Sequence, residues 1–226
     1  MRLPNPARRA YRKVLAARRD LIDLPNTRRV VLEHVGATPI VVIPGVLNPK
    51  RTRTGALLAE WLDETLVPRG SQVLDLGTGS GIGAVFAARF ASHVVASDIN
   101  PTAVRNTRVN VLLHSLEAKV EVRLGDLFEP VPNLKFDVVL FNPPYLVGTP
   151  KDLTDLAWRS TDVLARFASG LPNHLRDGGH ALVVWSSDAD EDALLGPLSK
   201  SDLTFEVVRE RDLINEVVKV WRIRRA

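Results

Sequence analysis

The sequence predicts an α/β fold built on a mostly parallel sheet, for three reasons. From residue 72 onward, short apolar β-rich runs alternate with longer amphipathic segments, which is the pattern of strands joined by crossover helices. A glycine-rich turn joins the first of these strands to its helix. The last two β-rich runs, 204–209 and 216–222, have six residues between them, so they are expected to pair antiparallel.

The N-terminal residues predict a small extension before this sheet. Residues 6–20 place apolar side chains on one face of a helix whose remaining surface is basic. Residues 28–34 and 39–43 are short β-rich runs around a glycine, so a β-hairpin is expected. Leucines at helical spacing then predict an amphipathic helix over 55–66.

The remaining elements follow one another in the order that a parallel sheet requires. Strands are expected at residues 73–76, 94–97, 119–124, 136–141 and 180–185. Helices are expected at residues 81–90, 100–116, 161–175 and 190–200. Asn100 is a favourable N-cap, and Pro101 suits the first helical turn. The strongly apolar run 136–141 is expected in the middle of the sheet, where both faces are buried.

Composition excludes several kinds of protein. The 226 residues, 45% of them apolar and 25% charged, suit a globular domain with a buried core. No cysteine is present, which excludes disulfides, thiolate metal sites and cysteine nucleophiles. The most apolar stretch, 39–47, contains two prolines and is too short to span a membrane. With no visible secretory signal, the cytoplasm is the expected compartment and no membrane partner is expected.

Charge divides the chain into two expected domains, a basic extension over 1–53 and the α/β domain over 54–226. The extension holds twelve Lys and Arg against three acids, a net charge of +9, whereas the rest of the chain carries −5. Such an arm either binds an anionic partner or is a solvated helix face. Both interpretations remain open.

The first functional motif is the glycine-rich segment 73–83. Gly77, Gly79 and Gly81 lack Cβ atoms, so a ligand can lie against the backbone beside a helix N-terminus. Asp98 ends the next strand, 21 residues after Gly77, as does the carboxylate that binds ribose hydroxyls in nucleotide-binding α/β folds. The segment is therefore expected to bind the nucleoside part of a cofactor.

Asp75 and Asp126 discriminate between cofactors. Asp75 ends the first strand, where it repels a diphosphate and attracts a cation such as the ammonium group of S-adenosylmethionine. Asp126 follows the strand at 119–124 and is expected to accept a hydrogen bond from an adenine amino group. The two carboxylates favour S-adenosylmethionine, although an NAD-dependent oxidoreductase would use the same sheet and Asp98.

The most specific motif is Asn142-Pro-Pro-Tyr145, which follows the strand at 136–141. Two consecutive prolines fix the backbone and remove two N–H donors. The Asn142 amide oxygen and the Pro143 carbonyl are expected to accept hydrogen bonds from a planar NH₂ group, which the Tyr145 ring covers. The motif lies at the carboxyl end of a strand, where ligands bind in such sheets.

These motifs resemble those of class I S-adenosylmethionine-dependent methyltransferases. The residues that carry the resemblance are Asp75-Leu-Gly-Thr-Gly-Ser-Gly81, Ser97-Asp-Ile-Asn-Pro101, Gly125-Asp126 and Asn142-Pro-Pro-Tyr145. The last is similar to the motif of the amino-group methylating branch, which includes release-factor glutamine, rRNA guanine-N2 and adenine-N6 DNA methyltransferases. The resemblance covers about residues 41–222 and implies a Rossmann-like sheet and S-adenosylmethionine as cofactor.

Residues and resemblance together imply three groups of site residues. The catalytic residues are Asn142, Pro143 and Tyr145, and these three bind the substrate together with Pro144. The cofactor-binding residues are Asp75, Gly77, Thr78, Gly79, Gly81, Asp98, Ile99, Asp126, Leu127 and Asn142. No metal is expected, because the five histidines are scattered without ligand spacing.

The sequence leaves the substrate open. The compact chain resembles glutamine methyltransferases that lack the helical domain preceding the core in larger bacterial enzymes, which favours a protein substrate such as a release factor. The segment 49–54 lacks the acid of their Pro-Arg-x-Glu-Thr element, and the basic extension favours rRNA. We therefore predict protein glutamine, with rRNA guanine-N2 or another nucleic-acid amino group as the alternative. A non-catalytic nucleic-acid-binding protein would give the intact motifs no role.

Overall fold

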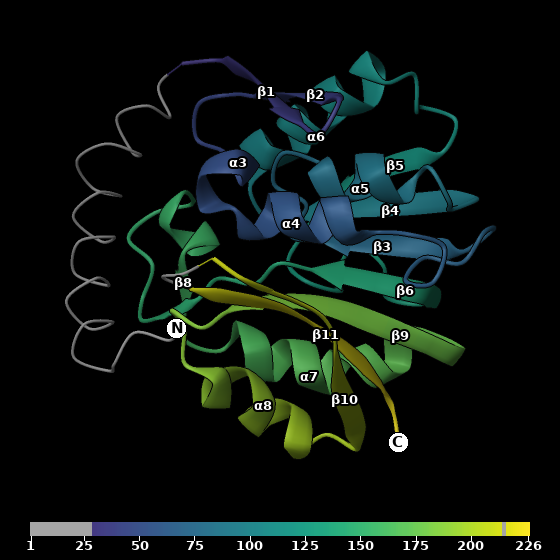
Figure 1. Ribbon diagram of the computed structural model, residues 1–226, viewed down its shortest axis with the longest axis vertical. Helices are drawn as coiled ribbons and strands as arrows, with labels where there is room; N and C mark the ends of the chain where they lie inside the picture. Colours follow the sequence, from purple (N-terminus) through teal and green to yellow (C-terminus); the bar gives the residue numbers. More distant parts are fainter. Residues whose placement is uncertain (1–28, 214–215) are drawn as a thin grey trace.

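The computed structural model of the chain describes residues 29–213 and 216–226 (Figure 1). The helix predicted at 6–20, and with it most of the basic extension, lies outside the described residues. The described part comprises the predicted hairpin and the predicted α/β domain.

A seven-stranded sheet lies at the centre of the described part. Its strands are β3 (Gln72–Leu76), β4 (His93–Asp98), β5 (Val120–Leu124), β6 (Phe136–Phe141), β9 (Leu175–Ser186), β10 (Leu203–Asp212) and β11 (Val217–Arg225). Their spatial order is β10-β11-β9-β6-β3-β4-β5, with β6 in the middle as predicted. The strands from β5 to β9 pair in parallel, whereas β11 pairs antiparallel with both β9 and β10. The predicted sheet with its antiparallel C-terminal pair is confirmed.

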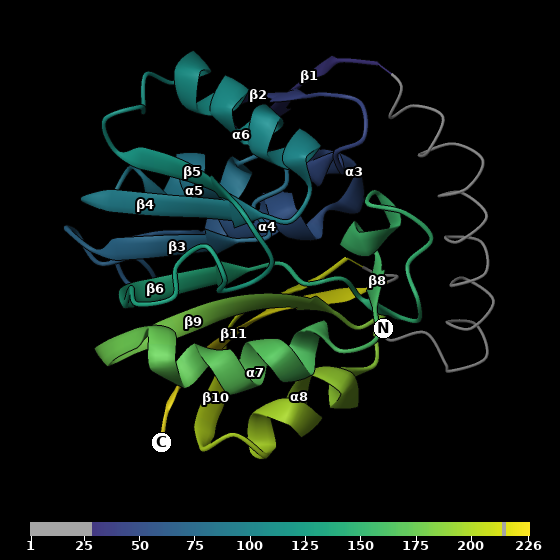
Figure 2. The same ribbon diagram turned by 180° about the vertical axis from the view of Figure 1, so that it is seen from behind.

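Helices cover both faces of this sheet. The helices α4 (Thr54–Trp61), α5 (Ile82–Ala87) and α6 (Pro101–Leu113) pack on one face, and α7 (Val163–His174) and α8 (Glu191–Ser199) pack on the other. Seen from behind in Figure 2, α7 lies in front of the sheet while α4 and α5 lie beyond it. Successive residues of β3 enter the two cores, since Val73 packs in the first and Leu74 in the second.

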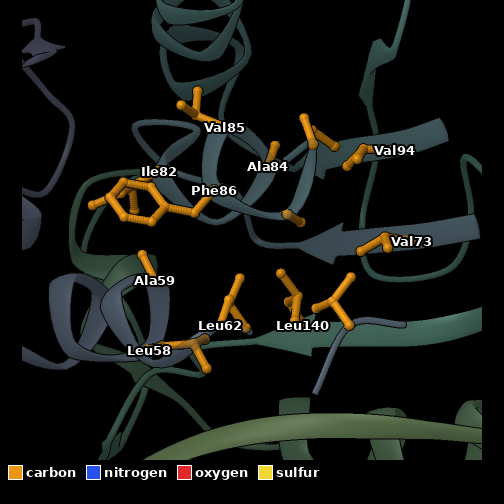
Figure 3. Packing of buried hydrophobic residues seen from close by; sticks show 14 of the residues in the cluster. Leu58, Ala59, Leu62, Val73, Ile82, Ala84, Val85, Phe86, Val94 and Leu140 are labelled. Atoms are coloured by element: carbon orange, nitrogen blue, oxygen red, sulfur yellow. The ribbon is translucent and has the colours of Figure 1, made fainter. Parts of the chain in front are cut away.

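The first core fixes the position of α5, the helix that follows the glycine-rich turn. Leu58 and Ala59 of α4 belong to one buried cluster with Ile82 and Phe86 of α5, and Figure 3 shows Ala59 pointing toward Phe86. Leu58 and Phe86 are 4% and 5% exposed, and burying a side chain of this size stabilises the fold by about 1.5–3 kcal/mol. The turn before α5 therefore rests on a packed support.

The helix predicted over 55–66 is shorter in the structure. It ends at Trp61, and a turn carries the chain on to Leu66, which is fully buried. Oδ1 of Asp63 accepts hydrogen bonds from the backbone N–H groups of Thr65 (2.9 Å) and Leu66 (3.1 Å). A short acceptor side chain of this kind competes with helical hydrogen bonds, so the apolar spacing continues through a turn. The other predicted elements of the described part are present with shifted ends.

The predicted hairpin consists of β1 (Val31–Val35) and β2 (Thr38–Val42) and is held by two buried asparagines of α6. Asn106 accepts a hydrogen bond from the N–H of Ile43 (2.8 Å), and Asn110 accepts one from the N–H of Val41 (2.8 Å). The amide of Asn110 also donates to the Ser80 carbonyl (2.8 Å). One side chain thus connects the hairpin to the glycine-rich turn.

Candidate active site

A cavity of about 310 Å³ opens at the carboxyl ends of the parallel strands. Its walls come from the segments that follow β3, β4, β5 and β6, from the start of α4, and from residues beyond 150. Every predicted site residue except Gly81 lines this cavity. Parallel α/β sheets bind their ligands at this edge, so the structure brings the predicted residues to one place that suits a ligand.

The glycine loop, residues 77–83, needs its glycines for two different reasons. Gly77 and Gly79 have φ values of +64° and +58°, a left-handed conformation that glycine adopts without strain, and both line the cavity. Gly81 has φ +83°, and a Cβ there would lie 2.9 Å from Cγ2 of Thr107 on α6. Gly81 therefore allows α5 to pack against α6 and does not itself reach the cavity wall.

Asp75 is buried beneath the glycine loop. Its Oδ2 accepts hydrogen bonds from the Thr78 hydroxyl and from the N–H of Ala84 (2.8 Å). A Cβ on Gly83 would lie 2.5 Å from Asp75 Oδ1, so only glycine leaves room for the carboxylate. Burial raises the pKa of Asp75 to about 6, although both hydrogen bonds lower it. Asp75 thus braces the loop and also contributes to the cavity wall.

Asp98 connects the end of β4 to the glycine loop. Its Oδ2 accepts a hydrogen bond from the N–H of Gly79 (2.9 Å), and its Oδ1 accepts one from the N–H of Asn100 (2.8 Å). Burial raises the pKa of this carboxyl, while the backbone hydrogen bonds lower it. The next residue, Ile99, is 40% exposed and lines the same cavity. Asp98 therefore fixes the loop and faces the ligand space.

Asp126 has a partner that the sequence did not predict. Its Oδ2 pairs with Nη2 of Arg166 on α7 at 2.6 Å, and both residues line the cavity. This carboxylate raises the pKa of Arg166, so the guanidinium stays charged at neutral pH. Leu127 beside it has φ +46° and supplies an apolar surface to the same wall.

Asn142, Pro143, Pro144 and Tyr145 form what we call the target slot, at the end of β6. The Tyr145 hydroxyl donates a hydrogen bond of 2.6 Å to Oδ1 of Asn142. The amide nitrogen of Asn142 faces Gly55 of α4, where a Cβ would come within 3.4 Å. These two contacts orient the carboxamide, and its oxygen keeps a second lone pair for another donor.

Tyr145 is enclosed by groups that are far apart in the sequence. Trp185 packs edge-on against it, with ring centroids 5.2 Å apart and an interplanar angle of 86°. Burial raises the pKa of the Tyr145 phenol, the Thr54 hydroxyl lowers it, and the Glu216 carboxylate raises it. The phenol therefore stays protonated at neutral pH and remains a hydrogen-bond donor.

Residues 146–162, the cover segment, fold back over the cavity. Within it β7 (Leu146–Val147) pairs in parallel with β8 (Arg159–Ser160), and η2 (Asp155–Ala157) lies between them in the chain. Leu153, Leu156 and Trp158 of this segment line the cavity. The cover segment thus adds an apolar wall beside the target slot.

Three contributions to the site had not been predicted from the sequence. Arg166 pairs with Asp126, Gly55 lies against Asn142, and Glu216, which is 6% exposed, pairs with Arg53 at 2.9 Å. A glycine inside a predicted helix often marks a close approach, so Gly55 carried a usable signal. Arg166 and Glu216 carried none, because their partners are distant in the chain.

The two buried histidines, His174 and His180, have structural contacts. Nε2 of His180 hydrogen-bonds the Leu66 carbonyl (2.9 Å), and burial lowers its pKa to about 4, so it is neutral. Nδ1 of His174 lies 2.8 Å from the Gly170 carbonyl. Within residues 29–213 and 216–226, no three His, Asp or Glu side chains gather so that they could hold a metal ion. No helix in the same ranges is long and apolar enough to cross a membrane.

Comparison with known proteins places the chain among methyltransferases. The family model described as the methyltransferase small domain matches residues 38–212. A candidate protein N5-glutamine methyltransferase of Methanocaldococcus jannaschii is 30% identical, over 69% of this chain and 83% of that protein. The release factor glutamine methyltransferase of Gloeobacter violaceus is 31% identical, over 79% and 69%. The ribosomal RNA small subunit methyltransferase C of Alcanivorax borkumensis is 30% identical, over 71% and 45%.

A solved structure shows the same fold. The T. thermophilus 16S rRNA guanine-N2 methyltransferase, in complex with AdoMet and guanosine, has a TM-score of 0.64 and 24% identity. The match covers 88% of this chain and 50% of that one, so the chain spans about half the length of this structural relative.

Proposed function

The chain belongs to the methyltransferase small domain family and is an S-adenosylmethionine-dependent methyltransferase, and from this premise we propose that it methylates the side-chain nitrogen of a protein glutamine. The observation that carries the proposal is the oriented Asn142 carboxamide. Its oxygen is held by the Tyr145 hydroxyl at 2.6 Å and keeps a lone pair that can accept a hydrogen bond from a planar NH₂ group. A release factor, or a protein with a similar exposed glutamine, is the proposed partner.

The chemistry of the cavity fits S-adenosylmethionine. We assign Asp98 to the ribose hydroxyls, Asp126 to the adenine amino group and Asp75 to the methionine ammonium. Each oxygen of Asp98 accepts one backbone N–H and keeps a lone pair for a hydroxyl donor. Ile99 and Leu127 offer apolar surface to the adenine ring. Three carboxylates in one wall suit a ligand that carries positive charge.

The target slot supplies orientation. When bound, S-adenosylmethionine provides an electrophilic methyl group on a positively charged sulfur. Asn142 Oδ1 and the Pro143 carbonyl would accept the two N–H bonds of the amide, while the Tyr145 ring covers its plane. The nitrogen lone pair would then be directed at the methyl carbon, so that the N–C bond forms as the S–C bond breaks and the sulfur leaves as a neutral thioether. The methylated nitrogen would release a proton to water without a general base. Orientation of this kind lowers a barrier by about 7–11 kcal/mol.

Two observations favour a protein glutamine over an rRNA guanine. The chain spans 83% of the M. jannaschii relative named for glutamine methylation, but 45% of the relative named for rRNA. The cover segment beside the target slot has three acids and two basic residues, so it does not attract phosphates. The basic extension over 1–53 favours the rRNA alternative.

The proposal is tested by offering a purified release factor and purified rRNA side by side, with labelled S-adenosylmethionine, from low to moderate salt. We expect label on a glutamine of the release factor with weak salt dependence. Binding through phosphates weakens with a log–log slope of about 0.7–0.9 per contact. Steeply salt-sensitive labelling of RNA, with none on the release factor, would move the assignment to rRNA. Deletion of residues 1–20 should slow association without abolishing turnover.

A further inference from the structure

We infer that Glu216 is a positioning residue for the target slot, because its carboxylate joins the two walls that enclose Asn142 and Tyr145. The inference rests on the function proposed for that slot. Glu216 directly precedes β11 and is 6% exposed. Carboxylates are rarely buried to this degree unless they are paired, and each oxygen of Glu216 has a different partner.

The first partner is Arg53, which belongs to the wall made by α4. Its Nη2 lies 2.9 Å from Oε1 of Glu216. Arg53 is the joint between α3 (Pro49–Thr52) and α4, and its φ of +63° is a left-handed conformation that a non-glycine residue rarely adopts. Two residues later Gly55 lies against the amide nitrogen of Asn142. The ion pair therefore holds the joint that sets the distance between α4 and the target slot.

The second partner is Ser186, which belongs to the wall made by β9. Its hydroxyl donates a hydrogen bond of 2.7 Å to Oε2 of Glu216, and Ser186 is 3% exposed. The preceding residue, Trp185, packs edge-on against Tyr145. The hydrogen bond therefore fixes the end of β9 whose Trp185 packs against the Tyr145 ring.

The Glu216 carboxylate thus connects Arg53 with Ser186, which are 133 residues apart in the sequence. Near these two partners, Gly55 lies against Asn142 and Trp185 packs against Tyr145. The partners of Glu216, Arg53 and Ser186, lie outside the glycine loop, which α4 touches through the apolar packing of Leu58 and Ala59 near Ile82 and whose polar contacts run through Asp75 and Asp98. Loss of the Glu216 charge should therefore loosen the target slot and leave the cofactor-binding loop unchanged. A carboxylate that merely stabilised the fold would affect both alike.

The first experiment follows hydrogen exchange in the intact protein by mass spectrometry, without any ligand. Glu216→Gln keeps the shape and an acceptor for Ser186 but removes the charge facing Arg53. We expect faster exchange in segments 53–58 and 142–147 and unchanged exchange in 77–83. The control is Glu206→Gln on β10, which removes an exposed partner of Arg222 and Arg224 on β11. This variant should change the exchange of none of these segments.

Equal exchange in the wild type and in Glu216→Gln, or faster exchange that includes 77–83 to the same degree, would overturn the inference. If Glu216→Gln does not fold, Glu216→Asp, which keeps the charge and shortens its reach, is compared in the same segments. The double variant Arg53→Gln/Glu216→Gln removes both charges of the ion pair, so no unpaired charge remains. Its hydrogen exchange should therefore be closer to that of the wild type than the exchange of Glu216→Gln is.

The second experiment measures methyl transfer to the release factor. We expect Glu216→Gln to lower kcat/KM about tenfold, with the calorimetric affinity for S-adenosylmethionine unchanged and with partial recovery in Glu216→Asp. An equal loss in cofactor affinity would contradict a positioning role. If the wild type does not methylate the release factor, the proposed substrate is wrong, and the exchange experiment still decides the role of Glu216.

Discussion

The cofactor half and the target half of the cavity are built in different ways. In the cofactor half, the carboxylates of Asp75 and Asp98 accept hydrogen bonds from backbone N–H groups in the glycine loop (Gly79), just after it (Ala84) and just after β4 (Asn100). In the target half, Tyr145 depends on neighbours from β9 and from the start of α4. A local motif makes the first half, whereas tertiary packing assembles the second.

This difference separates what each half controls. The buried carboxylates brace the glycine loop from beneath, so changes there should alter cofactor affinity or stability. The target slot has one internal hydrogen bond and relies on its walls for position, so changes there should alter turnover. The expected effects below are arranged from the largest to the smallest.

Asn142→Ala should have the largest effect. It removes the oriented acceptor, and small misplacements of a reacting group cost about a hundredfold in rate, so kcat should fall by at least that factor. Affinity for S-adenosylmethionine should change little, because the carboxylates that bind it are untouched. Steady-state kinetics and calorimetry measure the two quantities. If turnover stays within a few-fold of wild type, the target slot is wrongly assigned.

Asp98→Ala should instead weaken cofactor binding. A hydrogen bond to a charged group contributes about 1.5–3 kcal/mol, so the Kd for S-adenosylmethionine should rise by about 10- to 150-fold. Asp177→Ala is a matched control, because that carboxylate is fully exposed and pairs with Arg225 far from the cavity. If a folded Asp98→Ala protein binds S-adenosylmethionine with unchanged affinity, Asp98 does not bind the cofactor.

Sequence reasoning succeeded where contacts are local. The side chain of Asn100 caps α6 by accepting from the N–H of Thr102 (2.9 Å), with Pro101 in the first turn, as predicted. Gly77, Gly79 and Asp98 belong to one strand–helix–strand unit, so their spacing in the sequence was enough to predict that Asp98 meets the glycine loop. In the structure Asp98 accepts a hydrogen bond from the N–H of Gly79.

Sequence reasoning failed where a residue's neighbour depends on the order of the strands. Glu216 meets Ser186 because β11 pairs with β9, and Arg166 meets Asp126 because α7 packs beside the loop after β5. The packing of Gly81 on Thr107 of α6 was also missed, since a glycine pattern does not reveal which helix passes behind it.

Gly83→Ala tests how tightly the cofactor half is packed. The new methyl group would lie 2.5 Å from Oδ1 of Asp75, so it must displace a buried carboxylate. Overpacking of this kind lowers the free energy of unfolding by about 1–3 kcal/mol. The control is Gly196→Ala in α8, where the site is open, which should raise it by up to about 1 kcal/mol. Equal denaturation midpoints for the two variants would show that a methyl group at position 83 fits beside the Asp75 carboxylate without strain.

The pH dependence of stability tests Asp75 directly. Its pKa rises from 3.8 to about 6 on folding, so the folded protein holds a proton that the unfolded chain releases. This stabilisation is complete below about pH 4 and is lost as the pH rises to about 6. Over that range the free energy of unfolding falls by up to about 1.4 kcal/mol per pH unit. Denaturant titrations from pH 4 to 7 should show the decline in the wild type but not in Asp75→Asn. If the stability of both proteins declines equally with pH, the raised pKa does not belong to Asp75.

Arg166→Gln should have the smallest effect, and it sharpens the comparison of the two halves. The Asp126–Arg166 pair is a long-range contact of the cofactor half, and its arginine side chain is 42% exposed. Exposed ion pairs contribute about 0.2–1 kcal/mol and are screened by salt, so the Kd for S-adenosylmethionine should rise less than about fivefold. The difference from wild type should vanish at high salt, as calorimetry at two ionic strengths would show. A loss as large as that of Asp98→Ala would mean that the cofactor half also depends on tertiary assembly, and the contrast between the halves would not hold.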